Sequence, residues 1–221
     1  MRLVWLYYFE MLGTAIFAIT GVLVVTRRGL DVFGALVLGL VTALGGGTAR
    51  DVLLRVPVFW IQDINYVWAG LMGALGAFFL GAFLRNTSGL LLYLDALGAA
   101  LFAMSAAEKV MFIHTHPAVA VIMGILTGIG GGLARDVLAD RPTLLMSRDI
   151  YATPILIGCT AYVLLRHFVP GYRYTSFVGF AVIFGFRALA IHFHLEMPRW
   201  LTHVEEGAEQ DSLLARPRAE P

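Results

Sequence analysis

Long apolar segments joined by short polar links occupy most of the chain. We mark seven such segments, at residues 3–26, 31–49, 65–84, 90–112, 117–134, 150–169 and 174–196. A helix needs roughly 20 mostly apolar residues to cross a bilayer, and most of these segments are close to that length. The pattern predicts an all-α polytopic membrane protein with seven transmembrane helices.

Composition supports this class and argues against an enzyme. The chain is 59% hydrophobic and 14% charged, against roughly 45–50% and about 25% in ordinary globular domains. The single Cys159 gives no disulfide framework. His192 and His194 are too close in sequence to share a helical face, so we interpret them as interfacial. No P-loop, catalytic triad or metal-ligand spacing is evident, and we expect no cofactor and no nucleic-acid partner.

The polar composition after Pro198 sets the limit of the membrane domain. Residues 1–198 are predicted to form a single transmembrane domain. Residues 199–221 are polar and contain prolines, which is typical of a disordered tail. The first apolar segment contains Glu10 and lacks a well-placed small-residue cleavage site, so we expect a first membrane span there rather than a signal peptide.

The apolar segments contain an internal repeat at one constant spacing, which is the spacing between Glu10 and Asp95. We call this spacing the repeat offset. It aligns Glu10 with Asp95 and brings two GGGxARDVL blocks into register, with 18 identities over the 48 positions of residues 10–57. Repeat one covers about 3–84, repeat two about 90–169, and an extra helix at about 174–196 stands outside the duplication. Because each copy holds three spans, the second must enter the membrane from the opposite side, so we predict an inverted repeat.

The arginines of the short links predict the orientation. Positive residues collect on the cytoplasmic side of membrane proteins. The richer side contains Arg27, Arg28, Arg85, Arg141, Arg148, Arg199, Arg216 and Arg218, and the poorer side contains Arg2, Arg55, Arg166 and Arg173. We therefore predict a protein of the cell inner (plasma) membrane, with its N-terminus outside and its C-terminal tail in the cytoplasm.

Three consecutive glycines interrupt the second span of each repeat. Each glycine costs a helix about 1 kcal/mol relative to alanine, so we expect the second and fifth helices to be kinked or broken there. Freed backbone groups cannot face lipid, and paired broken helices in inverted halves indicate a permeation or binding site. The predicted pathway residues are Gly45, Gly46, Gly47, Gly130, Gly131 and Gly132.

An Arg-Asp pair follows each glycine triplet. Arg50 with Asp51, and Arg135 with Asp136, are predicted to lie beside the pathway, facing a wet interior or each other, where a mobile arginine would act as a gate. The alternative is that they are interfacial charges at a helix end, with each arginine extending to water.

Two further cations lie within apolar segments. Lys109 follows Glu108, either as a headgroup-exposed pair near a helix end or as a contact of the cation pathway or of lipid phosphate. Arg187 lies in the middle of the last span, so it requires a carboxylate or carbonyl partner. Asp95, Glu10 and Glu108 are the candidate carboxylates in other spans.

Two copies of GGGxxRD in an inverted three-plus-three arrangement with a seventh span closely resemble prokaryotic relatives of the trimeric intracellular cation (TRIC) channels. The same bacterial sequences are also grouped under a glycine-transporter-type domain. The resemblance implies a homotrimer with a pore in each subunit, bounded by the second and fifth helices, and potassium as the usual permeant ion. It places the kinks at Gly45 to Gly47 and Gly130 to Gly132, with Arg50 and Arg135 beside the pathway.

Animal members of that family carry a Lys-Glu-Val motif that begins a basic cluster and contacts a phosphoinositide headgroup. Here the order is Glu108, Lys109, Val110, and no basic cluster follows. The resemblance therefore does not extend to phosphoinositide regulation, although membrane lipids are expected partners.

The same motif serves a monovalent cation channel and, alternatively, a secondary transporter of a small zwitterion such as glycine. A bare arginine about 4 Å from a permeating cation costs on the order of 4 kcal/mol at an effective dielectric constant of 20. A channel therefore needs compensating oxygen atoms, which Asp51, Asp136 and backbone carbonyls are expected to supply. A membrane scaffold that passes nothing is a third alternative.

Overall fold

The computed structural model describes residues 2–25, 31–84, 89–113, 116–146, 150–169, 171–172 and 174–196. The predicted tail, residues 199–221, lies outside these ranges, as do most of the arginines that predict the orientation. The described residues form eight helices: α1 (Arg2–Val25), α2 (Val32–Leu53), α3 (Phe59–Gln62), α4 (Asn65–Leu84), α5 (Leu90–Phe112), α6 (Pro117–Leu138), α7 (Ala152–Phe168) and α8 (Thr175–His192).

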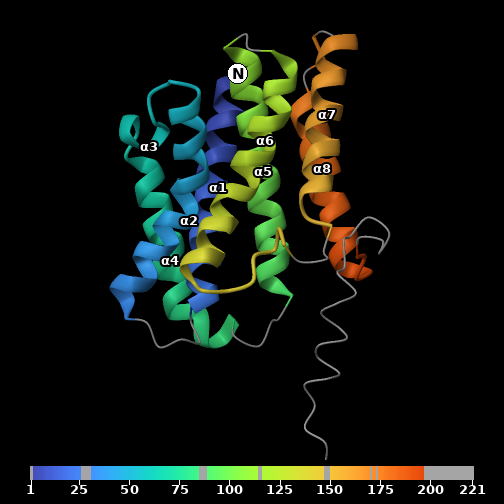
Figure 1. Cartoon of the computed structure of the whole chain (residues 1–221). Helices are drawn as coiled ribbons and strands as arrows, with labels where there is room; N and C mark the ends of the chain where they lie inside the picture. Colours follow the sequence, from blue (N-terminus) through green and yellow to red (C-terminus); the bar gives the residue numbers. More distant parts are fainter. Residues whose placement is uncertain are drawn as a thin grey trace, which may run out of the picture.

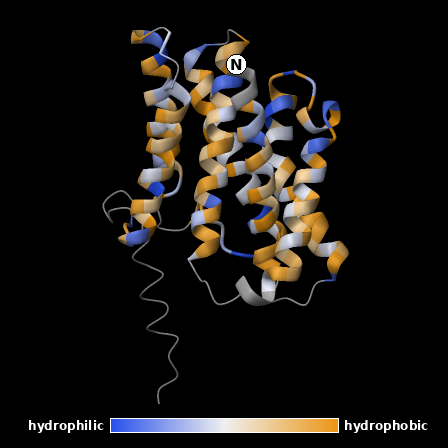
Figure 2. Cartoon of the chain, turned by 180° about the vertical axis from the view of Figure 1, so that it is seen from behind, coloured by the Kyte–Doolittle hydropathy of each residue, from blue (hydrophilic) through white to orange (hydrophobic). Residues whose placement is uncertain are grey.

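The all-helical membrane class is confirmed. Each of the seven predicted segments coincides with one long helix, and α3 is an additional helix of four residues. Among the described residues, α1, α2, α5, α6 and α8 are long and apolar enough to cross a bilayer, whereas the apolar parts of α4 and α7 are shorter, at Asn65–Gly81 and Ala152–Phe168. Apolar positions occur along the whole length of the helices, with hydrophilic positions among them (Figure 2). The count of seven spans stays a prediction.

The long helices form two groups that meet along α1, α2, α5 and α6 (Figure 1). In the first group, α1, α2 and α4 pack on one another. In the second, α6 packs on α5 and α7, while α8 packs on both α5 and α7 and keeps these two mostly apart. The chain runs in opposite directions along α1 and α5, as the colours of Figure 1 show.

The helices α2 and α6 extend four residues beyond the predicted ends, so that both Arg-Asp pairs are helical. Each helix closes with one residue in the left-handed region, Arg55 (φ 54°) and Asp140 (φ 45°). The next residue then donates its N–H back to the helix, Val56 to the carbonyl of Asp51 (3.0 Å) and Arg141 to that of Asp136 (2.9 Å). This arrangement satisfies carbonyls that a helix end otherwise leaves open.

The exposed Arg55 is a suitable site to test this helix end. A left-handed non-glycine residue costs about 1–2 kcal/mol, and glycine loses about 0.5–1 kcal/mol more backbone entropy on folding. We therefore expect Arg55→Gly to stabilise the protein by about 0.5 kcal/mol and Arg55→Val to destabilise it, because β-branched residues avoid this conformation. Thermal unfolding midpoints in detergent measure both changes, and a lower midpoint for the glycine variant than for the valine variant contradicts the assignment.

The predicted break at the glycine triplets is wrong for this structure. Helix α2 is continuous through Gly45 to Gly47, and α6 is continuous through Gly130 to Gly132. The glycines instead allow the two helices to touch. A Cβ on Gly46 would lie 2.6 Å from the carbonyl oxygen of Thr127, which is backbone and cannot move aside. Close approach of backbones at small residues is a general mode of helix packing in membranes.

The contacts between the two groups are reciprocal at the repeat offset. Gly131 meets the carbonyl oxygen of Thr42, just as Gly46 meets that of Thr127. The rings of Phe17 and Phe102 stack with their centroids 5.4 Å apart and an interplanar angle of 12°. Both phenylalanines also face glycines of the other group, Phe17 facing Gly98 and Phe102 facing Gly13. Equivalent positions of the two repeats thus contact each other across the centre of the bundle.

Candidate functional site

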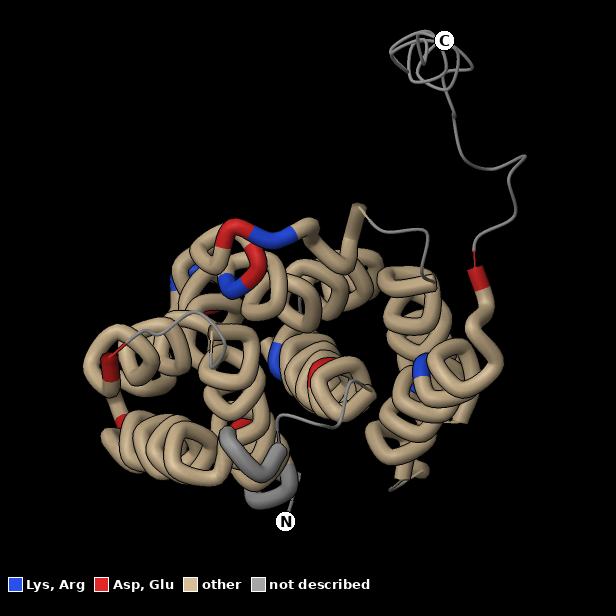
Figure 3. The backbone as a smooth tube through the Cα atoms, turned by 90° about the horizontal axis from the view of Figure 1, so that it is seen from below, with Lys and Arg blue, Asp and Glu red and all other residues tan. Residues whose placement is uncertain are grey.

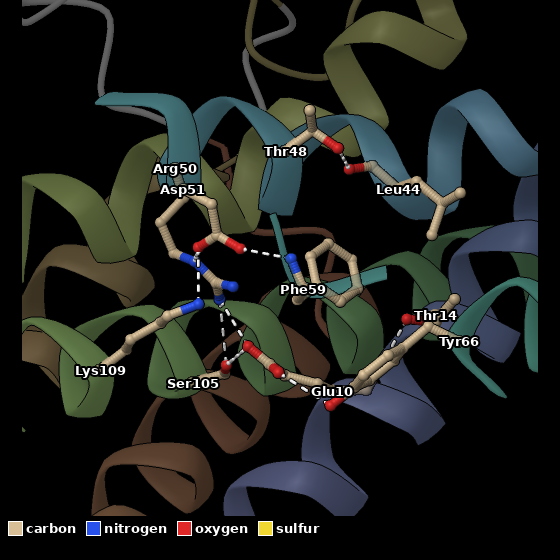
Figure 4. Close-up of polar contacts among 10 residues, drawn as sticks. All are labelled: Glu10, Thr14, Leu44, Thr48, Arg50, Asp51, Phe59, Tyr66, Ser105 and Lys109. Carbon is tan, nitrogen blue, oxygen red and sulfur yellow. Dashed lines mark hydrogen bonds and ion pairs between the residues drawn. The ribbon is translucent and has the colours of Figure 1, made fainter. Parts of the chain in front are cut away.

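The Arg50 guanidinium lies at the centre of a buried polar cluster beside α2 (Figure 4). Its Nη1 is 2.7 Å from Oε1 of Glu10 on α1, and its Nε is 2.7 Å from Oδ1 of the adjacent Asp51. Lys109, from α5, places its Nζ 2.8 Å from the same Asp51 oxygen. One guanidinium and one ammonium therefore bind two carboxylates, and the charges of these four side chains cancel.

Two hydroxyl groups complete this arrangement. Ser105 Oγ donates a hydrogen bond to Oε1 of Glu10 (2.6 Å), and the Tyr66 hydroxyl donates one to Oε2 (3.1 Å). Both carboxylate oxygens of Glu10 are therefore bound. We call this set the first cluster; it consists of Glu10, Arg50, Asp51, Tyr66, Ser105 and Lys109.

A second cluster repeats this geometry beside α6. Arg135 Nη1 is 2.7 Å from Oδ1 of Asp95 on α5, and Arg135 Nε is 2.9 Å from Oδ1 of Asp136. Tyr151, at the start of α7, occupies the position equivalent to Tyr66. The second cluster consists of Asp95, Arg135, Asp136 and Tyr151, and each member lies at the repeat offset from its equivalent in the first cluster.

Each aspartate also holds the chain segment that follows its helix. The second carboxylate oxygen of Asp51 accepts a hydrogen bond from the backbone N–H of Phe59 at 2.9 Å. That of Asp136 accepts one at 3.3 Å from Leu144, the equivalent position of repeat two. The arginine and the segment after the helix are thus bound by one carboxylate in each repeat.

Both arginines are removed from solvent. Arg50 is 1% exposed and Arg135 is 0% exposed, and their carboxylate partners are buried as well. Charges buried to this degree require ion pairing and hydrogen bonding, because their desolvation costs several kcal/mol per ion. The alternative that these arginines extend to surrounding water is therefore wrong. Viewed along the helices, charged positions lie on the helices of the bundle as well as in the links (Figure 3).

The two clusters differ in what the rest of the bundle adds to them. The position equivalent to Ser105 is Thr20, which donates a hydrogen bond to the carbonyl of Phe17 at 2.9 Å. The position equivalent to Lys109 is Val24, which has no charge. The second cluster is instead approached from α8 by Arg187, whose guanidinium carbon lies 4.5 Å from the centroid of the Tyr151 ring. The symmetry of the ion pairs therefore does not extend to the flanking cations.

Arg187 has the carbonyl partner that its position in the span requires. Its Nη1 donates to the backbone oxygen of Ile150 at 2.9 Å. The candidate carboxylates are used elsewhere: Glu10 and Asp95 bind the two cluster arginines, and Glu108 accepts a hydrogen bond from Ser176 on α8 at 2.8 Å. Lys109 points to Asp51 and is 22% exposed, so it belongs to the first cluster rather than to an isolated pair with Glu108.

Several buried polar atoms gather around Gly132. A Cβ on this glycine would lie 2.9 Å from the Tyr151 hydroxyl and 3.0 Å from Oδ1 of Asp95. Among the described residues, Oδ2 of Asp95 and Nη2 of Arg135 have no hydrogen-bond partner. Buried polar atoms are nearly always bound to protein or to ordered water. Oδ2 of Asp95 and Nη2 of Arg135 are therefore the atoms of the second cluster that ordered water would bind.

Both Arg-Asp pairs were predicted as site residues, but, apart from Lys109, the side chains that bind them were not. Glu10, Asp95, Tyr66, Tyr151 and Ser105 were not among the predicted site residues. A signal was present for four of them: the repeat offset that aligns Glu10 with Asp95 also aligns Tyr66 with Tyr151, beyond the aligned range 10–57. Ser105 has no such signal, because its equivalent, Thr20, bonds within its own helix.

Comparison with known proteins identifies the family. The structure superimposes on that of the TRIC trimeric intracellular cation channel orthologue from Rhodobacter sphaeroides with a TM-score of 0.82, at 37% identity, covering 86% of this chain and 98% of that one. The chain belongs to the prokaryotic TRIC family. A second structure, from work on the structural basis for conductance through TRIC cation channels, gives a TM-score of 0.79 at 32% identity, covering 90% of this chain and 97% of that one.

Sequence comparisons agree with membership of the TRIC family. A family model described as glycine transporter matches residues 7–82 and again residues 92–167, two ranges separated by the same repeat offset. The inner membrane protein YadS of Escherichia coli, from the UPF0126 group, is 40% identical over 198 residues, covering 87% of this chain and 94% of YadS. Together with the apolar helices, these relatives make the chain a multi-pass membrane protein.

Proposed function

We propose that this protein is a monovalent cation channel for potassium, a homotrimer in which α2 and α6 line a pore within each subunit. The observation that carries the proposal is the pair of buried arginine–carboxylate clusters, one beside each of the crossing helices. Its relatives of known structure are TRIC cation channels, and the one from Rhodobacter sphaeroides is an orthologue of the trimeric intracellular cation channels. The inverted repeat, the outside N-terminus and the cytoplasmic C-terminus are part of the same proposal.

The clusters answer the electrostatic objection to arginines beside a cation pore. Two carboxylates bind each guanidinium, so neither Arg50 nor Arg135 faces the pathway as a bare charge. In the second cluster, Asp95 and Asp136 outnumber Arg135, and Oδ2 of Asp95 has no described hydrogen-bond partner. Carboxylate, hydroxyl and carbonyl oxygens are the groups that replace the water of a permeating cation.

Conduction requires α2 and α6 to separate, because their backbones touch at Gly46 and Gly131. The triplets Gly45 to Gly47 and Gly130 to Gly132 then line the opening, because none of these residues carries a Cβ that would narrow it. In this scheme the arginines and aspartates of the clusters form the gate. Lys109 is coupled to this gate through its ion pair with Asp51, and Arg187 is coupled to it through its contact with the Tyr151 ring.

Neutralising Asp95 tests the role of the second cluster. In Asp95→Asn the amide oxygen still accepts a hydrogen bond from Arg135, while one negative charge is lost. We expect potassium flux into liposomes to fall at least about tenfold, which corresponds to about 1.4 kcal/mol. The control is Asp31→Asn at the exposed N-cap of α2, where asparagine caps equally well. Equal flux in both variants would remove Asp95 from the pathway.

Transport of a small zwitterion such as glycine is the second candidate, favoured by the description of the matching family model. A helix N-terminus binds a carboxylate and backbone carbonyls bind an ammonium group. The deciding experiment is potassium flux into liposomes containing the purified protein, with glycine tested both as competitor and as substrate. Unitary potassium currents in a bilayer support the channel. Saturable glycine uptake without such currents supports the transporter and refutes the channel.

A further inference from the structure

A cavity of about 350 Å³ opens at the end of the bundle where α5 begins and α8 ends. It lies at the opposite end of α5 from Lys109 and the first cluster. Its polar wall is formed by Gly89, Tyr93, Arg187, His192 and His194. The volume is in the range of small-ligand sites, about 300–1,000 Å³.

The chemistry of the polar wall is cationic. Arg187 is 2% exposed, and its carbonyl contact with Ile150 and its ring contact with Tyr151 fix the guanidinium at the cavity. A guanidinium offers five N–H donors in a plane, a geometry that suits phosphate and carboxylate oxygens. His192 and His194 are exposed residues on the same wall, and their rings add donors. Among the described lining residues there is no Asp or Glu.

The first turn of α5 adds a second electropositive element. Helix α5 is 23 residues long and lines the cavity at Gly89 and Leu92. Its N-cap, Gly89, has no side chain to accept a hydrogen bond from the first backbone N–H groups, and the first turn contains no acidic residue. The N–H groups of a first helical turn and the helix dipole both favour an anion at such an end.

The remainder of the wall is apolar and includes Leu92, Ala190, Ile191 and Leu195. A small inorganic anion uses none of this surface, whereas a phospholipid presents both a phosphate and an apolar body. The cavity also lies where two membrane-spanning helices end, at the depth expected of lipid headgroups.

We propose that this cavity binds a phosphate group, with Arg187 and the first turn of α5 as its main contacts and the two histidines at its entrance. The apolar wall favours the phosphate of an anionic membrane phospholipid over free phosphate. The site shares Arg187 with the gate of the proposed channel, but phosphate binding itself does not rest on the channel function.

The test measures binding to the purified full-length protein in detergent. Phosphatidylglycerol, phosphatidylcholine and inorganic phosphate are added separately, and retained lipid is measured by native mass spectrometry and the shift of the unfolding midpoint by thermal scan. We expect phosphatidylglycerol to bind at least tenfold more tightly than phosphatidylcholine. If inorganic phosphate is the only additive that shifts the unfolding midpoint, the bound group is free phosphate rather than a lipid headgroup, and the site itself is still supported.

Variants assign the binding to the cavity. Arg187→Gln is expected to weaken phosphatidylglycerol binding at least tenfold. Because this residue is buried, the exposed pair His192→Gln and His194→Gln provides a second variant that leaves the core intact; we expect severalfold weaker binding. The control is Arg166→Gln in the last turn of α7, at the other end of the bundle. Wild-type affinity in the histidine variant, or equal binding of both lipids with no response to phosphate, overturns the proposal.

Discussion

Gly46→Ala is expected to destabilise the protein by about 2 kcal/mol through overpacking, although alanine is the better helix former. The added Cβ would lie 2.6 Å from the carbonyl oxygen of Thr127 and 3.1 Å from the backbone nitrogen of Gly131. Both neighbours are backbone atoms, so α2 and α6 must move apart to accept it. Overpacking against backbone atoms falls at the upper end of the usual range of about 1–3 kcal/mol, and the gain of about 1 kcal/mol in helix propensity reduces it to about 2 kcal/mol.

The adjacent Gly45→Ala is the matched control. A Cβ on Gly45 meets no heavy atom within 4 Å. This variant receives the same gain in helix propensity without the contact, so its unfolding midpoint in detergent should equal or exceed that of the wild type. Similar midpoints for the two alanine variants would show that the helices do not touch at Gly46 in the folded protein.

Arg135→Met is expected to destabilise the protein by about 3–5 kcal/mol, the usual consequence of removing one partner from a buried ion pair. Methionine fills a similar volume, but Asp95 and Asp136 are left buried without the cation that both bind. The fraction of folded protein after purification and the thermal unfolding midpoint measure the loss.

Two further variants separate lost pairing from lost packing. Arg141→Met changes an exposed arginine shortly beyond the end of α6 and should leave the midpoint unchanged. Adding Asp95→Asn to Arg135→Met removes one of the two stranded charges and should restore part of the stability. If the double variant is less stable than Arg135→Met by the full effect of Asp95→Asn, the two side chains are not coupled.

The positions of the helices are largely readable from the sequence because lipid demands long apolar segments, and seven such segments coincide with seven long helices. The positions of the helix ends are harder to predict from the sequence. The predicted segments end at residues 49 and 134, just before Arg50 and Arg135, since isolated charges are costly in a span, whereas both arginines lie in the last turn of their helices. Only the three-dimensional structure supplies the carboxylate of Glu10 or Asp95 that makes this placement stable.

The role of the glycine triplets illustrates a limit of sequence patterns. A glycine that allows a helix to unwind and one that allows another helix to approach are identical in sequence, because both depend on the absence of a Cβ. The identity of the neighbour decides between them, and for Gly46 that neighbour is Thr127, on a helix of the other repeat. The backbone carbonyl of Ile150, which binds Arg187, could not be predicted either, because a backbone carbonyl has no sequence signature.

The reciprocal contacts at the centre of the bundle bear on the ancestry of the chain. Gly13 contacts Phe102, and Gly98 contacts Phe17 in the same way. Each repeat therefore contributes one glycine and one phenylalanine to the interface. Two separate copies of one three-helix polypeptide, inserted in opposite orientations, would form these same contacts with identical sequences. The residues of these contacts are identical in the two repeats, so the sequence of one half specifies both sides of the central interface. Fusion of two copies would then free each half to diverge, as Lys109 opposite Val24 illustrates.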